Sequence, residues 1–200
     1  MNGPLVVGIF LFNEVEVLDF AGPFEVFSLA EYPETKEKVF KVVTISEKDI
    51  LLSARNGLKV KADYLFSNHP PLDVLIVPGG YGAEKIEIEN PIALAWLRET
   101  AARTGIVASV CTGAFLLAKT GVISDQQVTT HWMDQADLQK TYPRLKVISG
   151  RKFIDAGNVL TSGGISAGIH LSFHLVSRLV GKDVAQATAR RMEYDWSPTG

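Results

Sequence analysis

The only cysteine of the chain, Cys111, is the residue that the sequence places best for nucleophilic chemistry. It follows the apolar run 106–110 and precedes Thr112, Gly113 and a helical pattern, which puts it at a turn from a strand into a helix. The first N–H groups of a helix are unpaired and partly positive, so they favour thiolate over thiol. Such a turn also directs the side chain to the open end of a sheet, as in a nucleophile elbow, and Gly113 leaves room for close approach. Packing alone is the competing interpretation, because free cysteine is among the most buried residue types.

Two other features follow predicted strands and could complete a site. Gly79 and Gly80, after a strand at 72–77, can expose backbone N–H groups as an oxyanion hole does, and Tyr81 beside them could line a pocket. Asp19 is an acid among apolar neighbours before a predicted helix. In an apolar pocket beside a thiolate its carboxyl group would tend to stay protonated and donate a hydrogen bond to sulfur. Its alternative role is to cap the helix whose first turn holds Pro23.

The elements that must position these residues are apolar strands separated by helical patterns. Strands are predicted at 5–12, 38–46, 72–77, 106–110, 127–130, 146–148, 153–155 and 159–161, and helices from about 22, at 91–103, 133–140, 166–180 and 183–192. A small hairpin is predicted at 51–61 around a two-residue Asn56 and Gly57 turn. Strands that are apolar throughout indicate a parallel sheet covered on both faces, and ligands bind such sheets at the carboxyl ends of the strands. Cys111, Asp19 and the glycine loop are all expected there.

The composition of the chain limits the kinds of partner that it can bind. Two hundred residues with 46% hydrophobic content fit a single domain, 1–200, and a net charge of −2 offers no basic field for nucleic acid. The apolar run 5–12 is too short to cross a membrane and lacks the basic flank of a signal peptide, so no membrane partner is expected. One unpaired thiol and no export signal favour the cytoplasm.

His170 and His174 are spaced to share a helix face, but no nearby ligand completes a metal set, so they are interpreted as surface histidines.

Six ordered motifs carry a family resemblance that extends over essentially the whole chain. They are 18–23 (LDFAGP), 77–80 (VPGG), 109–114 (SVCTGA), 129–132 (TTHW), 161–168 (TSGGISAG) and 193–195 (EYD). Together they resemble the ThiJ/PfpI superfamily, which is class I glutamine amidotransferase-like, and within it the isonitrile hydratase branch most closely. The resemblance implies a flavodoxin-like three-layer α/β sandwich, mainly parallel, and a homodimer.

The resemblance also implies roles for individual residues. Cys111 matches the reactive cysteine of the family, Asp19 its acidic partner, and Thr112 the residue after the cysteine. Protease-like members have a histidine at that last position, and because threonine cannot accept a proton at neutral pH, a Cys-His peptidase is disfavoured. His131 matches a position where some relatives place a histidine near the cysteine, although a structural role beside Trp132 is an equal alternative.

The expected activity is that of a cofactor-independent hydro-lyase that adds water to a small-molecule isonitrile and yields an N-substituted formamide. Cys111 would add to the isonitrile carbon, Asp19 would supply a proton, and water positioned by Asp19 and Thr112 would hydrolyse the thioimidate. The alternative is a sensor, either of oxidation at the cysteine or of a ligand, since similar domains form part of AraC-type regulators. The chain shows no helix-turn-helix region, so direct DNA binding is not expected. A carbonyl-detoxifying activity, known for some relatives, is weakened by the missing Cys-His dyad.

Overall fold

The core of the protein is one seven-stranded sheet, seen in a computed structural model that describes residues 3–197. The strand order is β10-β11-β7-β6-β1-β2-β5, and every neighbouring pair is parallel except β10 with β11. The strands are β1 (Leu5–Phe10), β2 (Phe40–Ser46), β5 (Tyr64–Leu65), β6 (Val74–Val77), β7 (Ile106–Val110), β10 (Phe153–Asp155) and β11 (Val159–Ser162). The prediction of a mainly parallel α/β sheet is confirmed.

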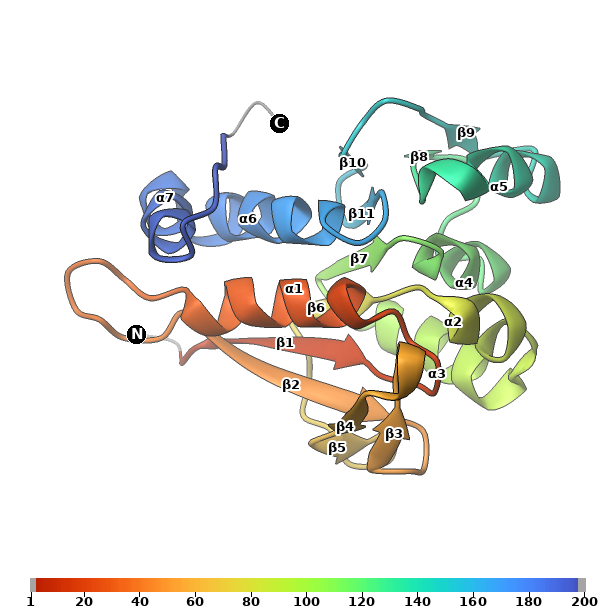
Figure 1. Ribbon diagram of the computed structural model, residues 1–200, viewed down its shortest axis with the longest axis horizontal. Helices are drawn as coiled ribbons and strands as arrows, with labels where there is room; N and C mark the ends of the chain where they lie inside the picture. Colours follow the sequence, from red (N-terminus) through yellow and green to blue (C-terminus); the bar gives the residue numbers. More distant parts are fainter. Residues whose placement is uncertain (1–2, 198–200) are drawn as a thin grey trace.

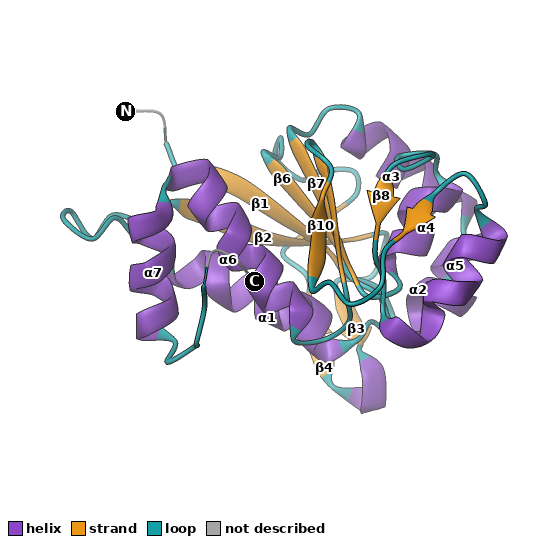
Figure 2. Cartoon of the chain, turned by 90° about the horizontal axis from the view of Figure 1, so that it is seen from above, coloured by secondary structure: helices purple, strands orange, loops and turns teal. Residues whose placement is uncertain are grey.

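Helices cover both faces of this sheet and make the fold a three-layer sandwich (Figures 1 and 2). One layer holds α1 (Val17–Leu29), α6 (Ala167–Val180) and α7 (Lys182–Arg191), and α1 and α7 both contact α6. The opposite side holds α2 (Tyr81–Lys85), α3 (Pro91–Ala101) and α4 (Gly113–Lys119), with α5 (Gln135–Thr141) at the periphery. Single 3₁₀ turns occupy Arg55–Gly57, Glu87–Glu89 and Trp132–Asp134. Since both faces are covered, β6 and β7 are buried along their whole length, which explains their unbroken apolar sequence.

Two small sheets flank the main one. Strands β3 (Leu51–Ser53) and β4 (Lys59–Lys61) form an antiparallel hairpin, while β8 (Gln127–Val128) and β9 (Lys146–Val147) pair in parallel. The predicted hairpin exists, but its predicted two-residue turn is wrong, because residues 54–58 connect the strands. Asn56 still adopts the left-handed conformation expected of such a turn, with φ of 60°.

Helix α1 begins earlier than the sequence indicated, and the difference concerns the candidate site. The helix starts at Val17, so Asp19 lies in its first turn instead of before it, and Pro23 lies in its interior. No side chain caps this helix, so the alternative role of Asp19 as a cap is excluded. The start was missed because Val17 and Leu18 carry no capping signal before them.

No helix within residues 3–197 is both long and apolar enough to cross a membrane.

Candidate active site

Cys111 directly follows β7 and adopts a strained backbone conformation. Its φ is 56°, a left-handed value that is uncommon for residues other than glycine and is often found at functional sites. The Cys111 N–H donates to the Gly163 carbonyl at 3.1 Å, and the Cys111 carbonyl accepts from the Thr130 hydroxyl at 2.7 Å. These two hydrogen bonds hold the strained turn. The structure therefore confirms a strand-to-helix elbow, with a side chain that is 8% exposed.

Asp19 lies beside this cysteine and is fully buried. Its Oδ2 accepts the Gly79 N–H at 3.1 Å and its Oδ1 accepts the Ile165 N–H at 2.9 Å. Burial raises the pKa of Asp19 to about 6, while the two N–H groups and the Cys111 thiol act against that rise by stabilising the carboxylate. The predicted meeting of an acid and a thiol is therefore observed, and burial shifts the pKa of the acid in the direction expected for an apolar pocket.

The resting state of the cysteine differs from the expectation. Burial and the negative charge of Asp19 raise the pKa of the Cys111 thiol, and the Thr112 N–H and hydroxyl oppose this rise only in part. This direction opposes the predicted thiolate, because desolvation and the neighbouring carboxylate favour the thiol while the helix terminus favours the thiolate.

The predicted oxyanion role of Gly79 and Gly80 is also wrong. The Gly79 N–H is bonded to Asp19, and the Gly80 N–H donates to Thr112 Oγ1 at 3.0 Å. Neither is free to stabilise charge on a substrate. The glycines are needed for close packing, since a Cβ on Gly79 would lie 2.5 Å from the Thr112 nitrogen. The loop thus positions Asp19 and Thr112 instead of binding the substrate itself.

His131 and Tyr81 occupy different surroundings. The His131 ring lies beside the sulfur, because a Cβ on Gly164 would come 2.4 Å from His131 Cδ2 and 3.1 Å from Cys111 Sγ. Tyr81 begins α2 and is half exposed, and the Arg55 guanidinium lies 5.6 Å from the centre of its ring. The structure therefore brings His131 to the elbow and places Tyr81 at the surface.

Two residues of the site were not singled out from the sequence. Ile165 donates its N–H to Asp19 and has a φ of 57°, a strained value for a β-branched residue. Gly164 has no side chain, and a Cβ at this position would contact both the Cys111 sulfur and the His131 imidazole. Both lie in the 161–168 motif, whose paired glycines were the available signal. The hydrogen bond from Ile165 depends on a contact across 146 positions, which no local pattern reveals.

The two histidines of α6 have different surroundings. His174 Nε2 lies 2.7 Å from Asp155 Oδ2, and Arg178 pairs with the same carboxylate. His170 is buried, which corrects the expectation that both histidines lie on the helix surface. Its ring packs near Phe153 and Tyr194 under the chain end. No group of three or more His, Cys, Asp or Glu residues suited to a metal occurs in the described part of the chain.

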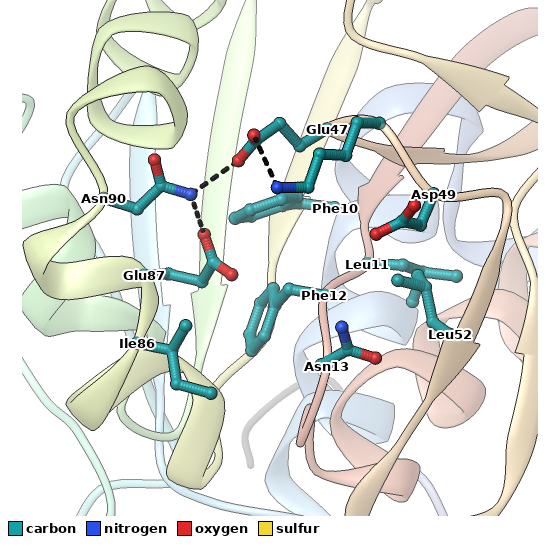
Figure 3. Close-up of a pocket in the computed structure, with 11 residues that line it drawn as sticks. Phe10, Leu11, Phe12, Asn13, Glu47, Asp49, Leu52, Ile86, Glu87 and Asn90 are labelled. Carbon is teal, nitrogen blue, oxygen red and sulfur yellow. Dashed lines mark hydrogen bonds and ion pairs between the residues drawn. The ribbon is translucent and has the colours of Figure 1, made fainter.

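A separate cavity of about 150 Å³ lies at the carboxyl ends of β1 and β2 (Figure 3). Asn90 spans it, donating to Glu47 Oε2 at 2.5 Å and to Glu87 Oε2 at 3.0 Å. The Asn90 side-chain oxygen also accepts the Ile92 and Ala93 N–H groups and so caps α3. The polar groups of this cavity therefore stabilise a helix start, and Cys111 is not among its lining residues.

A parallel sandwich with a strained cysteine elbow and a buried acid beside it defines a recognisable class of protein. The model of the DJ-1/PfpI family matches residues 6–178, and the chain belongs to this family. It is similar to an isonitrile hydratase of Pseudomonas putida, with 35% identity over 97% of this chain and 80% of that protein. It is also similar to the transcriptional regulator GbdR of Pseudomonas aeruginosa, with 26% identity over 97% of this chain and 52% of that protein. A solved ThiJ/PfpI family structure from Pseudomonas syringae superposes with a TM-score of 0.86 at 22% identity, covering 99% of this chain and 78% of the other.

Proposed function

We propose that this protein is an isonitrile hydratase, which adds water to an isonitrile carbon to give an N-substituted formamide without a cofactor. The observation that carries the proposal is the buried elbow, in which the Cys111 thiol lies beside the Asp19 carboxyl group. The 35% identity to an isonitrile hydratase supports the choice of substrate. The proposal includes a homodimer, as the family resemblance implies, and a cytoplasmic location, which the single unpaired thiol favours.

The addition step uses the single proton of the pair. Asp19 takes the proton from Cys111 as sulfur attacks the terminal carbon of the isonitrile. Asp19 then returns this proton to the same carbon, and the product is a thioimidate in which the carbon carries one hydrogen and a bond to sulfur. The Thr112 N–H and hydroxyl stabilise the sulfur while it carries negative charge. No net charge is gained or lost in this step.

Hydrolysis then completes the reaction. Water adds to the thioimidate carbon, a proton reaches the nitrogen, and the carbon–sulfur bond breaks to release the formamide. The thiol recovers its proton, so the enzyme returns to its starting state. The sum is one isonitrile and one water consumed for each formamide formed.

Ligand sensing is the second candidate, and the likeness to the regulator GbdR over almost the whole chain favours it. Oxidation sensing has less support, because a buried cysteine with a raised pKa is a poor target for peroxide. The test is to incubate the parent, Cys111→Ala and Asp19→Ala with cyclohexyl isocyanide and to follow the formamide. Turnover by the parent that both substitutions abolish supports the enzyme. An inert parent in which a small molecule raises the unfolding temperature supports the ligand sensor.

A further inference from the structure

Another cavity lies at the end of the sheet opposite to Cys111. Its volume is about 320 Å³, which is within the usual range for a small-molecule site. It lies at the amino ends of β6 and β7, because Leu72 and Thr104 line it and precede these two strands. The other lining residues are Phe66, His69, Pro70, Pro71, Thr100 and Arg103. A ligand bound here would not compete with a substrate at the elbow.

The aromatic wall of this cavity is already ordered in the protein. Phe66 stacks on Trp96, with ring centroids 4.0 Å apart and an interplanar angle of 3°. The Trp96 indole N–H donates to His69 Nε2 at 3.0 Å, and His69 Nδ1 lies 2.8 Å from the Pro70 carbonyl oxygen. A carbonyl only accepts and an indole N–H only donates, so Nδ1 carries the ring hydrogen and both nitrogens are used. The histidine therefore shapes the cavity without offering it a free polar atom.

Two polar side chains of the lining do have free hydrogen-bonding groups. Thr100 is 4% exposed, and its Oγ1 has no hydrogen-bond partner within residues 3–197. Buried hydroxyl groups are normally paired, so this one calls for an explanation. Arg103 Nε donates to the Glu99 carbonyl at 3.2 Å, and its two terminal nitrogens have no partner in the same part of the chain. A hydroxyl group and a guanidinium fork are therefore available to a ligand that accepts hydrogen bonds.

The charge of the lining determines which acceptor fits. Among the described residues that line the cavity, Arg103 is the only charged side chain, so an anion meets no opposing carboxylate. A guanidinium binds a carboxylate or a phosphate through two parallel hydrogen bonds. The side chains of Phe66, Pro71 and Leu72 favour an organic acid over inorganic phosphate, because they can bury its apolar part.

We infer that this cavity is a binding site for a small carboxylic acid with an apolar body. The carboxylate accepts hydrogen bonds from the terminal nitrogens of Arg103 and from the Thr100 hydroxyl. The apolar body packs against Phe66 and Leu72. The inference goes beyond the proposed function and does not depend on it, because none of these residues lies at the elbow.

Calorimetric titration of the full chain with benzoate, cyclohexanecarboxylate and hexanoate tests the site. We expect at least one of these acids to bind, and its neutral amide to bind about 10-fold more weakly or worse, since the amide carries no charge for the guanidinium. Arg103→Gln should weaken binding of the acid by about 10-fold or more. Thr100→Val should weaken it by about 3-fold or more, yet the unfolding temperature of the free protein should not fall, because the lost hydroxyl has no partner.

The matched control is Arg98→Gln, because Arg98 is an exposed arginine of the same helix, α3, that does not line this cavity. This variant should bind the acid like the parent. At constant ionic strength, inorganic phosphate at about 10 mM should not displace the acid.

Three results would overturn the inference. They are the failure of all three acids to bind at up to about 10 mM, binding by Arg103→Gln equal to that of the parent, and displacement of the acid by phosphate. The formamide assay of the same protein reports on the proposed function separately, so the failure of one is distinguishable from the failure of the other.

Discussion

The Asp19 carboxylate accepts the backbone N–H of Ile165 at 2.9 Å and so joins the first turn of α1 to the loop before α6. The same carboxylate accepts the Gly79 N–H, which brings in the loop after β6. One buried side chain thus joins three segments beside Cys111. This arrangement ties the position of the acid to the packing of the whole sandwich, and several consequences can be measured.

The stability of the protein should depend on the titration of Asp19. Its folded-state pKa of about 6 lies above the ordinary aspartate value of 3.8, so the folded state holds the proton more tightly than the unfolded state does. The contribution of this group is therefore most favourable below about pH 4, and roughly 3 kcal/mol of it is lost as the pH rises from about 4 through about 6. Urea unfolding of the parent and Asp19→Asn at a series of pH values measures the difference. A difference that stays constant with pH would refute the raised pKa.

The ionisation of Asp19 should also control activity, but in the opposite direction. Activity should rise as the carboxyl group loses its proton, whereas stability should fall. Below about pH 6 the carboxyl group is protonated and cannot take the thiol proton, so kcat/KM for an isonitrile should fall as the pH is lowered through this value. The pKa of the Cys111 thiol is raised, so any fall of kcat/KM at alkaline pH should occur above the pH at which an ordinary cysteine ionises. A profile of kcat/KM between about pH 5 and about pH 9 tests this. A rise in activity that follows an ordinary thiol ionisation would mean that a free thiolate is the reactive form.

Gly164→Ala should impair the site without unfolding the protein. The added methyl group would stand against His131 Cδ2 and close to Cys111 Sγ, where the substrate carbon must arrive. We expect at least about a 10-fold loss of kcat/KM, within the range that misplacing reacting groups produces. The matched control is Gly163→Ala, whose new methyl group would make only ordinary contacts, the nearest at 3.5 Å from Ala167 Cβ. Equal activities in the two variants would show that the gap is not part of the site.

Thr112→Val should cost both stability and activity. The valine removes the acceptor of the Gly80 N–H, and an unpaired buried N–H costs about 1–3 kcal/mol. It also removes the hydroxyl that stabilises negative charge on sulfur. Thr112→Ser keeps the oxygen and is the control for both effects. The unfolding free energy and kcat of the two variants are the measurements, and a valine variant equal to the serine variant in both would contradict the assigned role.

The sequence predicted the scaffold of this site well, because the scaffold depends on local patterns. The apolar run of β7, the change to helical spacing after it and the glycine at 113 together indicate an elbow. Parallel strands bring their carboxyl ends to one edge of a sheet, so an acid and a thiol in separate segments could be expected to meet there.

The bonding within the site could not be predicted in the same way. Whether the N–H groups of Gly79 and Gly80 face substrate or protein depends on how Asp19 and Thr112 pack against them. The thiol pKa likewise depends on burial, which competes with the helix terminus and has no sequence signature. Ile165 was missed for a related reason, because its backbone and not its side chain contacts the acid.

In the proposed reaction Cys111 and Asp19 share one proton and use it to add sulfur to an isonitrile carbon. Intact-protein mass spectrometry of the parent and of Cys111→Ala and Asp19→Asn, each mixed with cyclohexyl isocyanide, tests it most directly. We expect formamide release by the parent, no adduct on Cys111→Ala, and an adduct that forms much more slowly on Asp19→Asn. Formamide release by Cys111→Ala at the rate of the parent would contradict it.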